Sequence, residues 1–208
     1  ARTVLYVTSG WAFTYRLLDD GRRQILNIHL PGNIIGLGAI GRDVAAWGVE
    51  ALTDLSYIAL SRDALMARAS GKPEIVLRLT LEAARGEILV CERLADVARR
   101  SARVRVANLL FELYCRSTVL DGGPQPVSIP LTQDEIADAV GLTPIHVSRT
   151  LRAFKADGII RYVGHDLQII DAANLKRIST FDEPYIRWLH RPTFKVRAGR
   201  QPLRRSVG

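Results

Sequence analysis

Apolar residues recur at helical spacing in two short segments of the chain between residues 131 and 157. The first segment has them at i, i+1 and i+4, as Ile136, Ala137 and Val140. The second has them at i, i+4 and i+7, as Val147, Leu151 and Phe154. Both patterns predict short amphipathic helices, each with one buried face and one polar face.

Capping residues fix where these two helices begin and end. Thr132 and Glu135 have the T-x-x-E spacing of a capping box, which satisfies free backbone amides at a helix start. Gly141 suits the position just after the first helix, where a positive φ is least costly without a Cβ. Thr143 followed by Pro144 predicts a second N-cap with proline at the first helical position. The segment is therefore expected to be a helix-turn-helix.

A β-hairpin is expected directly after the second helix. Gly158 ends that helix, and two β-rich runs follow at 159–163 and 167–170. The residues between them, Gly164-His165-Asp166, are expected to form the turn. Two capped helices followed by a hairpin are typical of a winged helix-turn-helix.

The face of the second helix opposite its apolar stripe has the residue types that bind duplex DNA. A major groove admits one helix, and an arginine there can pair with guanine O6 and N7. Arg149 is the candidate for that contact, and Ile145 offers only an apolar contact, for instance to a thymine methyl group. A single charge of this kind often lies on a solvated helix face, but the whole arrangement favours DNA. The predicted DNA-binding residues are Thr143, Pro144, Ile145, His146, Ser148, Arg149, Arg152 and Lys155.

Upstream, residues 4–18 have the pattern of strands, and apolar residues between 77 and 95 have the spacing of a long helix. Apolar residues of this helix repeat at 4-3-4-3-4 spacing, which is the a/d pattern of a coiled coil over about three heptads. We expect a parallel homodimer; the alternative is that this stripe packs against the chain's own strands. The predicted interface consists of Leu77, Leu81, Ala84, Ile88, Cys91 and Ala95.

These segments together resemble the Crp/Fnr transcription regulators over nearly the whole chain. Residues 21–36 (GRRQILNIHLPGNIIG) are similar to part of their cyclic-nucleotide-binding β-roll, and residues 100–115 (RSARVRVANLLFELYC) to the helix that opens their DNA-binding domain. The family's recognition-helix arginine falls on Arg149 and the serine of the Fnr branch on Ser148. The family's usual base-reading glutamate is replaced by Ile145.

The resemblance implies an α+β fold with four parts. These are a jelly-roll-like β-roll at 1–70, a dimerisation helix at 73–97, a winged helix-turn-helix at 101–174, and a basic extension at 175–208. Because strands begin almost at once, the first strands of the roll are expected to be missing from this sequence. An iron–sulfur cysteine cluster of the Fnr kind would lie in that missing part.

The expected sensor lacks the residues that hold a cyclic nucleotide in this family. The glutamate for the ribose falls on Leu37, the arginine for the phosphate on Val44, and the base-contacting residues of the helix on Val90 and Cys91. A phosphate without a counter-charge is costly to bury, so we expect no binding of cyclic AMP in the usual manner. His29 or His165 as a haem ligand and Cys91 as a redox sensor stay open but are weakly supported. The effector is unknown, and no cofactor is predicted.

Composition agrees with such a regulator. The 208 residues carry a net charge of +8, of which residues 174–208 contribute +7, from nine basic and two acidic residues. This extension is either a solubilising segment or a source of phosphate contacts, through Arg191, Lys195, Arg197, Arg200, Arg204 and Arg205. Two cysteines without metal-site spacing favour a reducing cytoplasm, and no apolar run is long enough to span a membrane.

Other classes of function have less support. The sequence lacks a P-loop, a G-x-S-x-G or H-E-x-x-H motif and a Cys/His constellation, so no enzyme is expected. The alternative is a ligand-binding β-roll, for a cyclic nucleotide or haem, in which DNA binding is lost or secondary. The expected partners are double-stranded DNA and a second copy of the chain, and also RNA polymerase if the protein is an activator.

Overall fold

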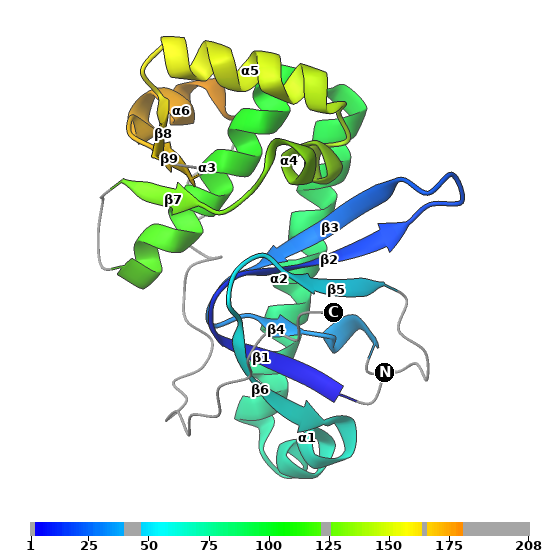
Figure 1. The fold of residues 1–208 in the computed structure, drawn as a ribbon. Coiled ribbons are helices and arrows are strands. Elements are labelled where there is room, and N and C mark those ends of the chain that lie inside the picture. Colours follow the sequence, from blue (N-terminus) through cyan, green and yellow to red (C-terminus); the bar gives the residue numbers. More distant parts are fainter. Residues whose placement is uncertain (1–2, 40–46, 122–125, 164–165, 181–208) are drawn as a thin grey trace. The chain divides into compact units, whose positions relative to one another are not determined.

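The computed structural model describes residues 3–39, 47–121, 126–163 and 166–180. Figure 1 gives the order of the helices and strands along the chain. The chain divides into two compact units, and their boundary lies between Val90 and Cys91, inside the long helix α2 (Pro73–Arg99). Each unit has its own core and is described separately.

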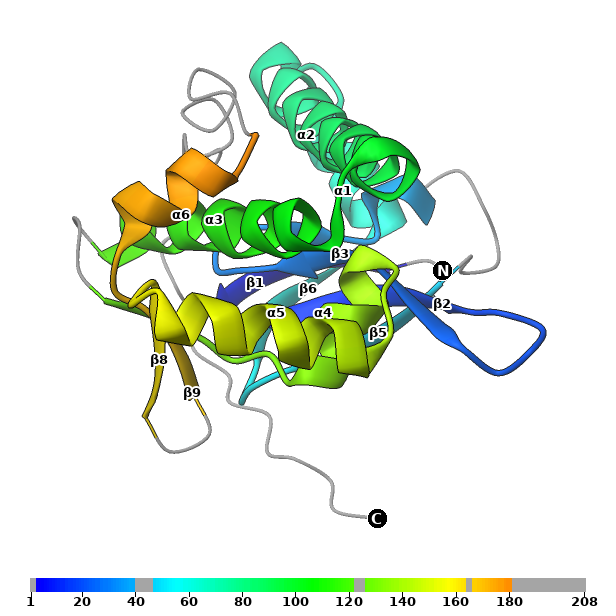
Figure 2. The same ribbon diagram turned by 90° about the horizontal axis from the view of Figure 1, so that it is seen from above.

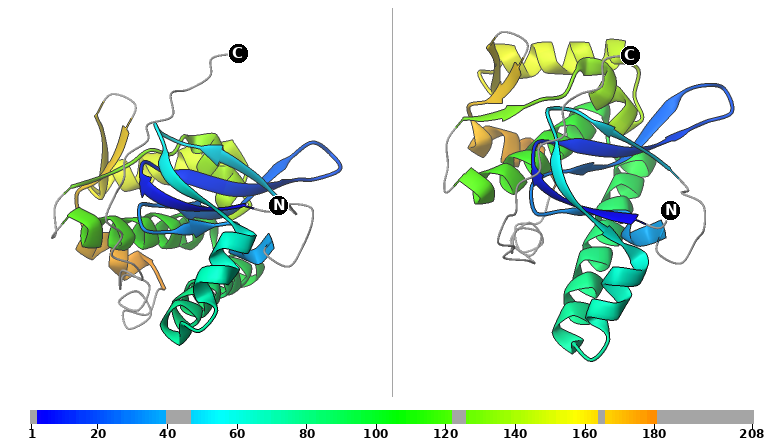
Figure 3. Two further views of the ribbon diagram at one scale, coloured as in Figure 1. Left: turned by 90° about the horizontal axis from the view of Figure 1, so that it is seen from below. Right: turned by 60° about the horizontal axis from the view of Figure 1, so that its bottom comes forward.

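Two antiparallel sheets of three strands form the first unit, with the strand orders β4-β1-β6 and β3-β2-β5. Their strands are coloured blue to cyan in Figure 3. Alternate residues face a core that contains Val7, Phe13, Ile28 and Ile35, all almost fully buried. The strands are β1 (Thr3–Ser9), β2 (Ala12–Leu17), β3 (Arg23–His29), β4 (Ile34–Ile35), β5 (Gly48–Ala51) and β6 (Ser56–Ser61).

A turn at Pro31-Gly32 precedes β4. Gly32 has φ +91°, and its amide donates to the Val7 carbonyl at 2.9 Å. The side chain of Asn33 accepts from the Leu30 amide at 2.8 Å, which closes the turn. A short 3₁₀ helix, η1 (Leu37–Ala39), follows β4, and α1 (Arg62–Ala69) follows β6.

The second unit is built around α3 (Ala102–Asp121), whose buried residues include Leu109, Leu110 and Leu113. Helices α4 (Gln133–Val140), α5 (Pro144–Ala156) and α6 (Ala172–Ile178) surround it, as Figure 2 shows. A three-stranded antiparallel sheet, in the order β7-β9-β8, completes the unit. Its strands are β7 (Val127–Ile129), β8 (Ile160–Val163) and β9 (Asp166–Ile169). These helices and strands together form the winged helix-turn-helix that the sequence predicts.

Candidate nucleic-acid interface

Local capping holds α4 and α5 in the helix-turn-helix arrangement, as the sequence predicts. The Glu135 amide donates to the Thr132 hydroxyl at 3.2 Å, and the Glu135 carboxylate accepts from the Thr132 amide at 2.7 Å. Gly141 ends α4 in the left-handed conformation, with φ +65° and ψ +43°. The Thr143 hydroxyl then accepts from the His146 amide at 3.4 Å, and Pro144 occupies the first turn of α5.

Helix α5 divides into a buried and an exposed face. Val147, Leu151 and Phe154 are at most 2% exposed and fix the helix against the unit's core. The residues predicted to bind DNA lie on the remaining surface. Thr143, Pro144, Ile145, His146, Arg149, Arg152 and Lys155 are exposed, and Ser148 is half-buried.

Arg149 extends from the exposed face and is available to a ligand. Among the described residues, it has no hydrogen-bond or ion-pair partner within the chain. Its neighbour one turn earlier, Ile145, is 70% exposed. The Thr143 hydroxyl and His146 Nδ1 lie 3.0 Å apart, so the cap also positions the imidazole at the start of the helix. This surface offers a guanidinium, an imidazole and an apolar side chain within about one turn.

An ion pair fixes the C-terminal end of α5, and sequence reasoning missed it. Arg103 on α3 contacts the carboxylate of Asp157 at 2.7 Å, and its guanidinium lies 4.9 Å from the Phe154 ring centroid. A carboxylate at a helix C-terminus is unfavourable because of the helix dipole, and the arginine offsets this. The two residues are 54 positions apart, so no local pattern points to the pair.

The wing is a short hairpin after α5. Arg161 of β8 donates to the Gln168 side chain of β9 at 3.0 Å. Asp166, which we expected in the turn, begins β9 instead, because it pairs with Val163 in the ladder. Gly164 and His165 lie outside the described residues.

Burial raises the pKa of the Tyr162 phenol in β8 above its ordinary value.

Buried polar groups join the end of α2 to α3 within the second unit. Asp96 is 1% exposed and accepts from Arg100 at 2.7 Å and from the Asn108 amide group at 2.6 Å. Asn108 also accepts from the Thr180 amide at 2.9 Å, which attaches the segment after α6. The hydrogen bond to Asp96 raises the pKa of the Arg100 guanidinium. This cluster was not predicted from the sequence.

A second buried cluster lies beside the first one. The Glu112 carboxylate is 2% exposed and accepts from Arg93 of α2 at 2.7 Å and from Arg116 at 2.8 Å. Because both carboxylate oxygens have a charged donor, the buried charge is compensated. The end of α2 is therefore held to α3 at two levels, by the Asp96–Asn108 hydrogen bond and by the Arg93–Glu112 ion pair.

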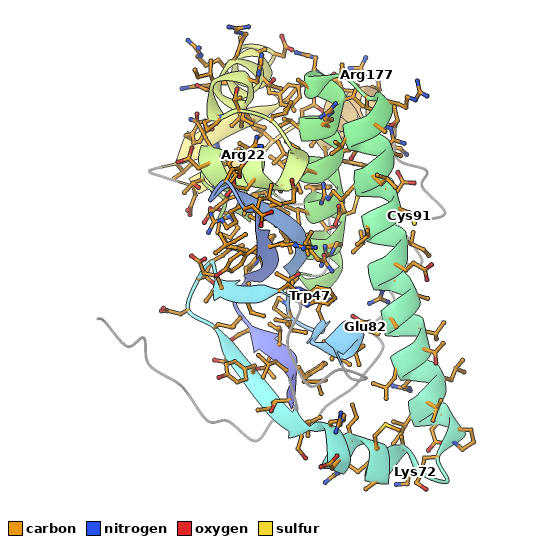
Figure 4. The ribbon with its side chains drawn as sticks, turned by 90° about the vertical axis from the view of Figure 1, so that its right-hand side faces the viewer. Arg22, Trp47, Lys72, Glu82, Cys91 and Arg177 are labelled. Atoms are coloured by element: carbon orange, nitrogen blue, oxygen red, sulfur yellow. The ribbon has the colours of Figure 1, made fainter. Side chains whose placement is uncertain are left out.

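The predicted dimer residues of α2 lie away from its buried face. Leu77, Leu81 and Cys91 are exposed, and Ala84, Ile88 and Ala95 are half-buried. Figure 4 shows Glu82, which is buried, and Cys91 on different sides of the helix. Four further apolar residues of α2 are exposed but were not among the predicted interface residues: Val76, Val90, Leu94 and Val97, of which Leu94 is 69% exposed.

The structure describes part of the expected sensor. Leu37 lies half-buried in η1, whereas Val44 lies outside the described residues, as do residues 181–208 of the basic extension. His29 is buried, and its Nε2 lies 3.3 Å from the Thr14 hydroxyl. On α2, the buried residues Arg85 and Glu82 form an ion pair at 3.0 Å.

In the described part of the chain, no helix is long and apolar enough to cross a membrane.

The fold and this surface define a DNA-binding winged helix-turn-helix joined to a β-roll. Sequence models of two domains match accordingly: the cyclic nucleotide-binding domain at residues 1–70 and the Crp-like helix-turn-helix domain at residues 104–178. The chain belongs to the Crp/Fnr family of transcription regulators, with a helix-turn-helix DNA-binding domain. The family resemblance seen in the sequence is thereby confirmed.

Individual relatives agree with this assignment. The chain is 33% identical to the transcriptional activator protein FnrL of Cereibacter sphaeroides, over 77% of this chain and 66% of that protein. It is 31% identical to the CRP-like cAMP-activated global transcriptional regulator of Mycobacterium tuberculosis, over 82% of this chain and 77% of that protein. The solved structure of FixK2 from Bradyrhizobium japonicum superposes with a TM-score of 0.75 at 27% identity, covering 87% and 89% of the two chains.

Proposed function

We propose that this regulator reads an operator with the exposed face of α5, and that Arg149 makes the main base contact. The observation that carries the proposal is the exposed Arg149 guanidinium, which has no partner among the described residues, on a helix capped at Thr143 and packed at its opposite face. A rigid helix with a free guanidinium can pair with both acceptors of a guanine. We expect Arg152 and Lys155, farther along the helix, to contact phosphates, which position the protein without reading sequence.

Selection of bound duplexes from random DNA, followed by gel-shift titration, tests this proposal. Arg149→Ala is expected to weaken binding to the selected duplex by about 1–3 kcal/mol, about 5- to 150-fold, for each half-site, and to relax the preference at one base pair of each half-site. Lys155→Ala is expected to weaken binding to all duplexes alike and to reduce the salt dependence. Arg68→Ala, an exposed arginine on α1, serves as the matched control. Unchanged affinity and selectivity of Arg149→Ala would contradict the proposal.

The exposed apolar residues of α2 support a homodimer formed by this helix. Leu77, Leu81 and Leu94 are between 36% and 69% exposed in the single chain. Covering large apolar side chains lowers the free energy, so these residues favour contact with a second copy. Two copies would present two recognition helices, so the operator is expected to be pseudo-palindromic with half-sites about one helical turn apart.

Sedimentation of the full chain at micromolar concentration tests the dimer. Leu81→Lys and Leu94→Lys are expected to shift the protein to a monomer, because they place charges in an apolar interface. Met66→Lys, at a residue of α1 that is 56% exposed, is the matched control and should remain a dimer. A wild-type monomer under these conditions would refute this part.

We further propose that the β-roll does not bind cyclic AMP in the family's usual manner. Leu37 stands at the position of the ribose-binding carboxylate, and the buried cation Arg85 is paired with Glu82. One relative is named a cAMP-activated regulator, so the family includes proteins that respond to cyclic AMP. Calorimetric titration of this protein with cyclic AMP is therefore the deciding measurement. Micromolar binding would overturn this proposal.

The remaining assignments follow from binding DNA. We propose a cytoplasmic regulator without enzymatic activity, whose other partner is RNA polymerase if it activates transcription. A ligand-binding module that has lost DNA binding is the competing function. A protein of that kind would select no duplex from random DNA and would shift none at low salt, whereas a regulator must bind one.

A further inference from the structure

Ile145 is the most exposed large apolar side chain among the described residues, at 70%. It lies in the first turn of α5 and adds nothing to the core, which Val147, Leu151 and Phe154 supply from the other face. As a β-branched residue in a helix it is restricted to one main χ1 rotamer. The helix therefore presents a stiff apolar group to whatever ligand binds this face.

Ile145 and Arg149 share the exposed face because they are four residues apart. That spacing corresponds to about 6 Å along the helix axis. Neighbouring base pairs are about 3.4 Å apart along the duplex, so the two side chains would meet positions one or two base pairs apart. If Arg149 contacts a guanine, Ile145 therefore contacts a base one or two base pairs away from that guanine.

The chemistry of isoleucine limits what that base can be. The side chain has no donor or acceptor, so facing a guanine, adenine or cytosine edge would remove water from polar groups and offer no replacement. The one apolar group on the base edges of the major groove is the 5-methyl group of thymine. Methylation of cytosine at C5 would supply the same group.

We propose that Ile145 makes operator recognition depend on a pyrimidine 5-methyl group, one or two base pairs from the guanine read by Arg149. This inference rests on the proposed function, since it requires α5 to enter the major groove. Discrimination at this position then comes from apolar contact, while Arg149 supplies the hydrogen bonds. Binding should respond to removal of a methyl group that takes no part in base pairing.

The probe is the duplex selected by the wild-type protein, with uracil replacing each thymine in turn. Uracil retains the base pair and the O4 acceptor and lacks only the methyl group. At the position that Ile145 meets, the replacement is expected to weaken binding about four-fold in one half-site, the effect of one buried methyl group. In both half-sites the expected loss is about 15-fold. As a second comparison, 5-methylcytosine at the same position should bind about four-fold more tightly than cytosine. This comparison tells whether the protein requires thymine itself or only the 5-methyl group.

Variants assign the effect to the side chain. Ile145→Ala should bind the thymine and uracil duplexes equally, because the group that contacts the methyl is gone. Val163→Ala, which alters another exposed apolar residue of the same unit, should retain the full uracil effect. A uracil effect that persists in Ile145→Ala would overturn the inference.

The outcomes separate this inference from the function on which it rests. If no thymine shows a uracil effect while Arg149→Ala still weakens binding and relaxes the preference at one base pair, the inference about Ile145 is wrong and the proposed function stands. If the wild-type protein selects no duplex at all, the proposed function fails as well. A four-fold effect confined to one thymine near the guanine of Arg149, and absent in Ile145→Ala, supports both.

Discussion

Asn108 lies at the centre of the buried polar cluster that joins α2 to α3, and its replacement should loosen the second unit. Its side chain is fully buried, donates to the Asp96 carboxylate at 2.6 Å, and accepts from the Thr180 amide at 2.9 Å. In Asn108→Ala, the buried carboxylate loses a donor, which costs about 1.5–3 kcal/mol for a hydrogen bond to a charged group. With the small cavity added, we expect a loss of about 2–4 kcal/mol.

Hydrogen exchange of the α3 amides in the full chain measures this loss, because it reports the opening of one unit at a time. Ser117→Ala on the same helix is the matched control. Its hydroxyl is also buried but has no partner among the described residues. Removing a buried, unsatisfied hydroxyl is expected to leave stability unchanged or to raise it by up to about 1 kcal/mol. If both variants exchange alike, the hydrogen bonds of Asn108 do not stabilise the unit.

Asn108→Asp refines the test by its dependence on pH. The substitution places a second carboxylate at hydrogen-bonding distance from Asp96, and two like charges so close raise the pKa of the pair. Stability that depends on this retained proton is present at low pH and is lost as pH rises through the raised folded-state pKa. The variant should therefore protect α3 better at pH 5 than at pH 8. Equal protection at both pH values would refute the explanation.

Three further predictions concern α5 and the wing. Thr143→Ala should destabilise the second unit by about 1 kcal/mol, since it removes the cap of α5, and hydrogen exchange of the α5 amides measures this loss. Arg103→Met should cost about 1 kcal/mol through the half-exposed ion pair with Asp157 and the contact with the Phe154 ring, and 1 M salt should reduce the difference from wild type. Tyr162→Phe should leave stability at neutral pH unchanged or raise it by up to about 1 kcal/mol, because the buried hydroxyl has no partner in the described part of the chain. Since burial raises the pKa of Tyr162, wild type should lose stability as pH rises above about 10, and denaturation at pH 8 and 11 should show less loss in the variant.

Local patterns in the sequence determined the helix-turn-helix. Capping residues act on amides within three positions, so Thr132, Glu135 and Thr143 mark helix starts without any knowledge of the fold. Helical periodicity likewise separates Val147 from Arg149, because the buried face repeats every three or four residues. The family resemblance added the β-roll, which local patterns alone indicated only as strands.

Only the tertiary structure decided how these elements are held together. Arg103 meets Asp157, and Asn108 meets Thr180, across 54 and 72 positions, and no periodic pattern encodes contacts between elements so far apart. The exposure of Leu94 was likewise not predictable from local spacing. The heptad pattern selected Ala95 as the interface residue, but which face of α2 stays exposed depends on what the rest of the chain covers. Local hydrogen bonds and periodicity are set by neighbouring residues, but burial and long-range ion pairs depend on the packed chain.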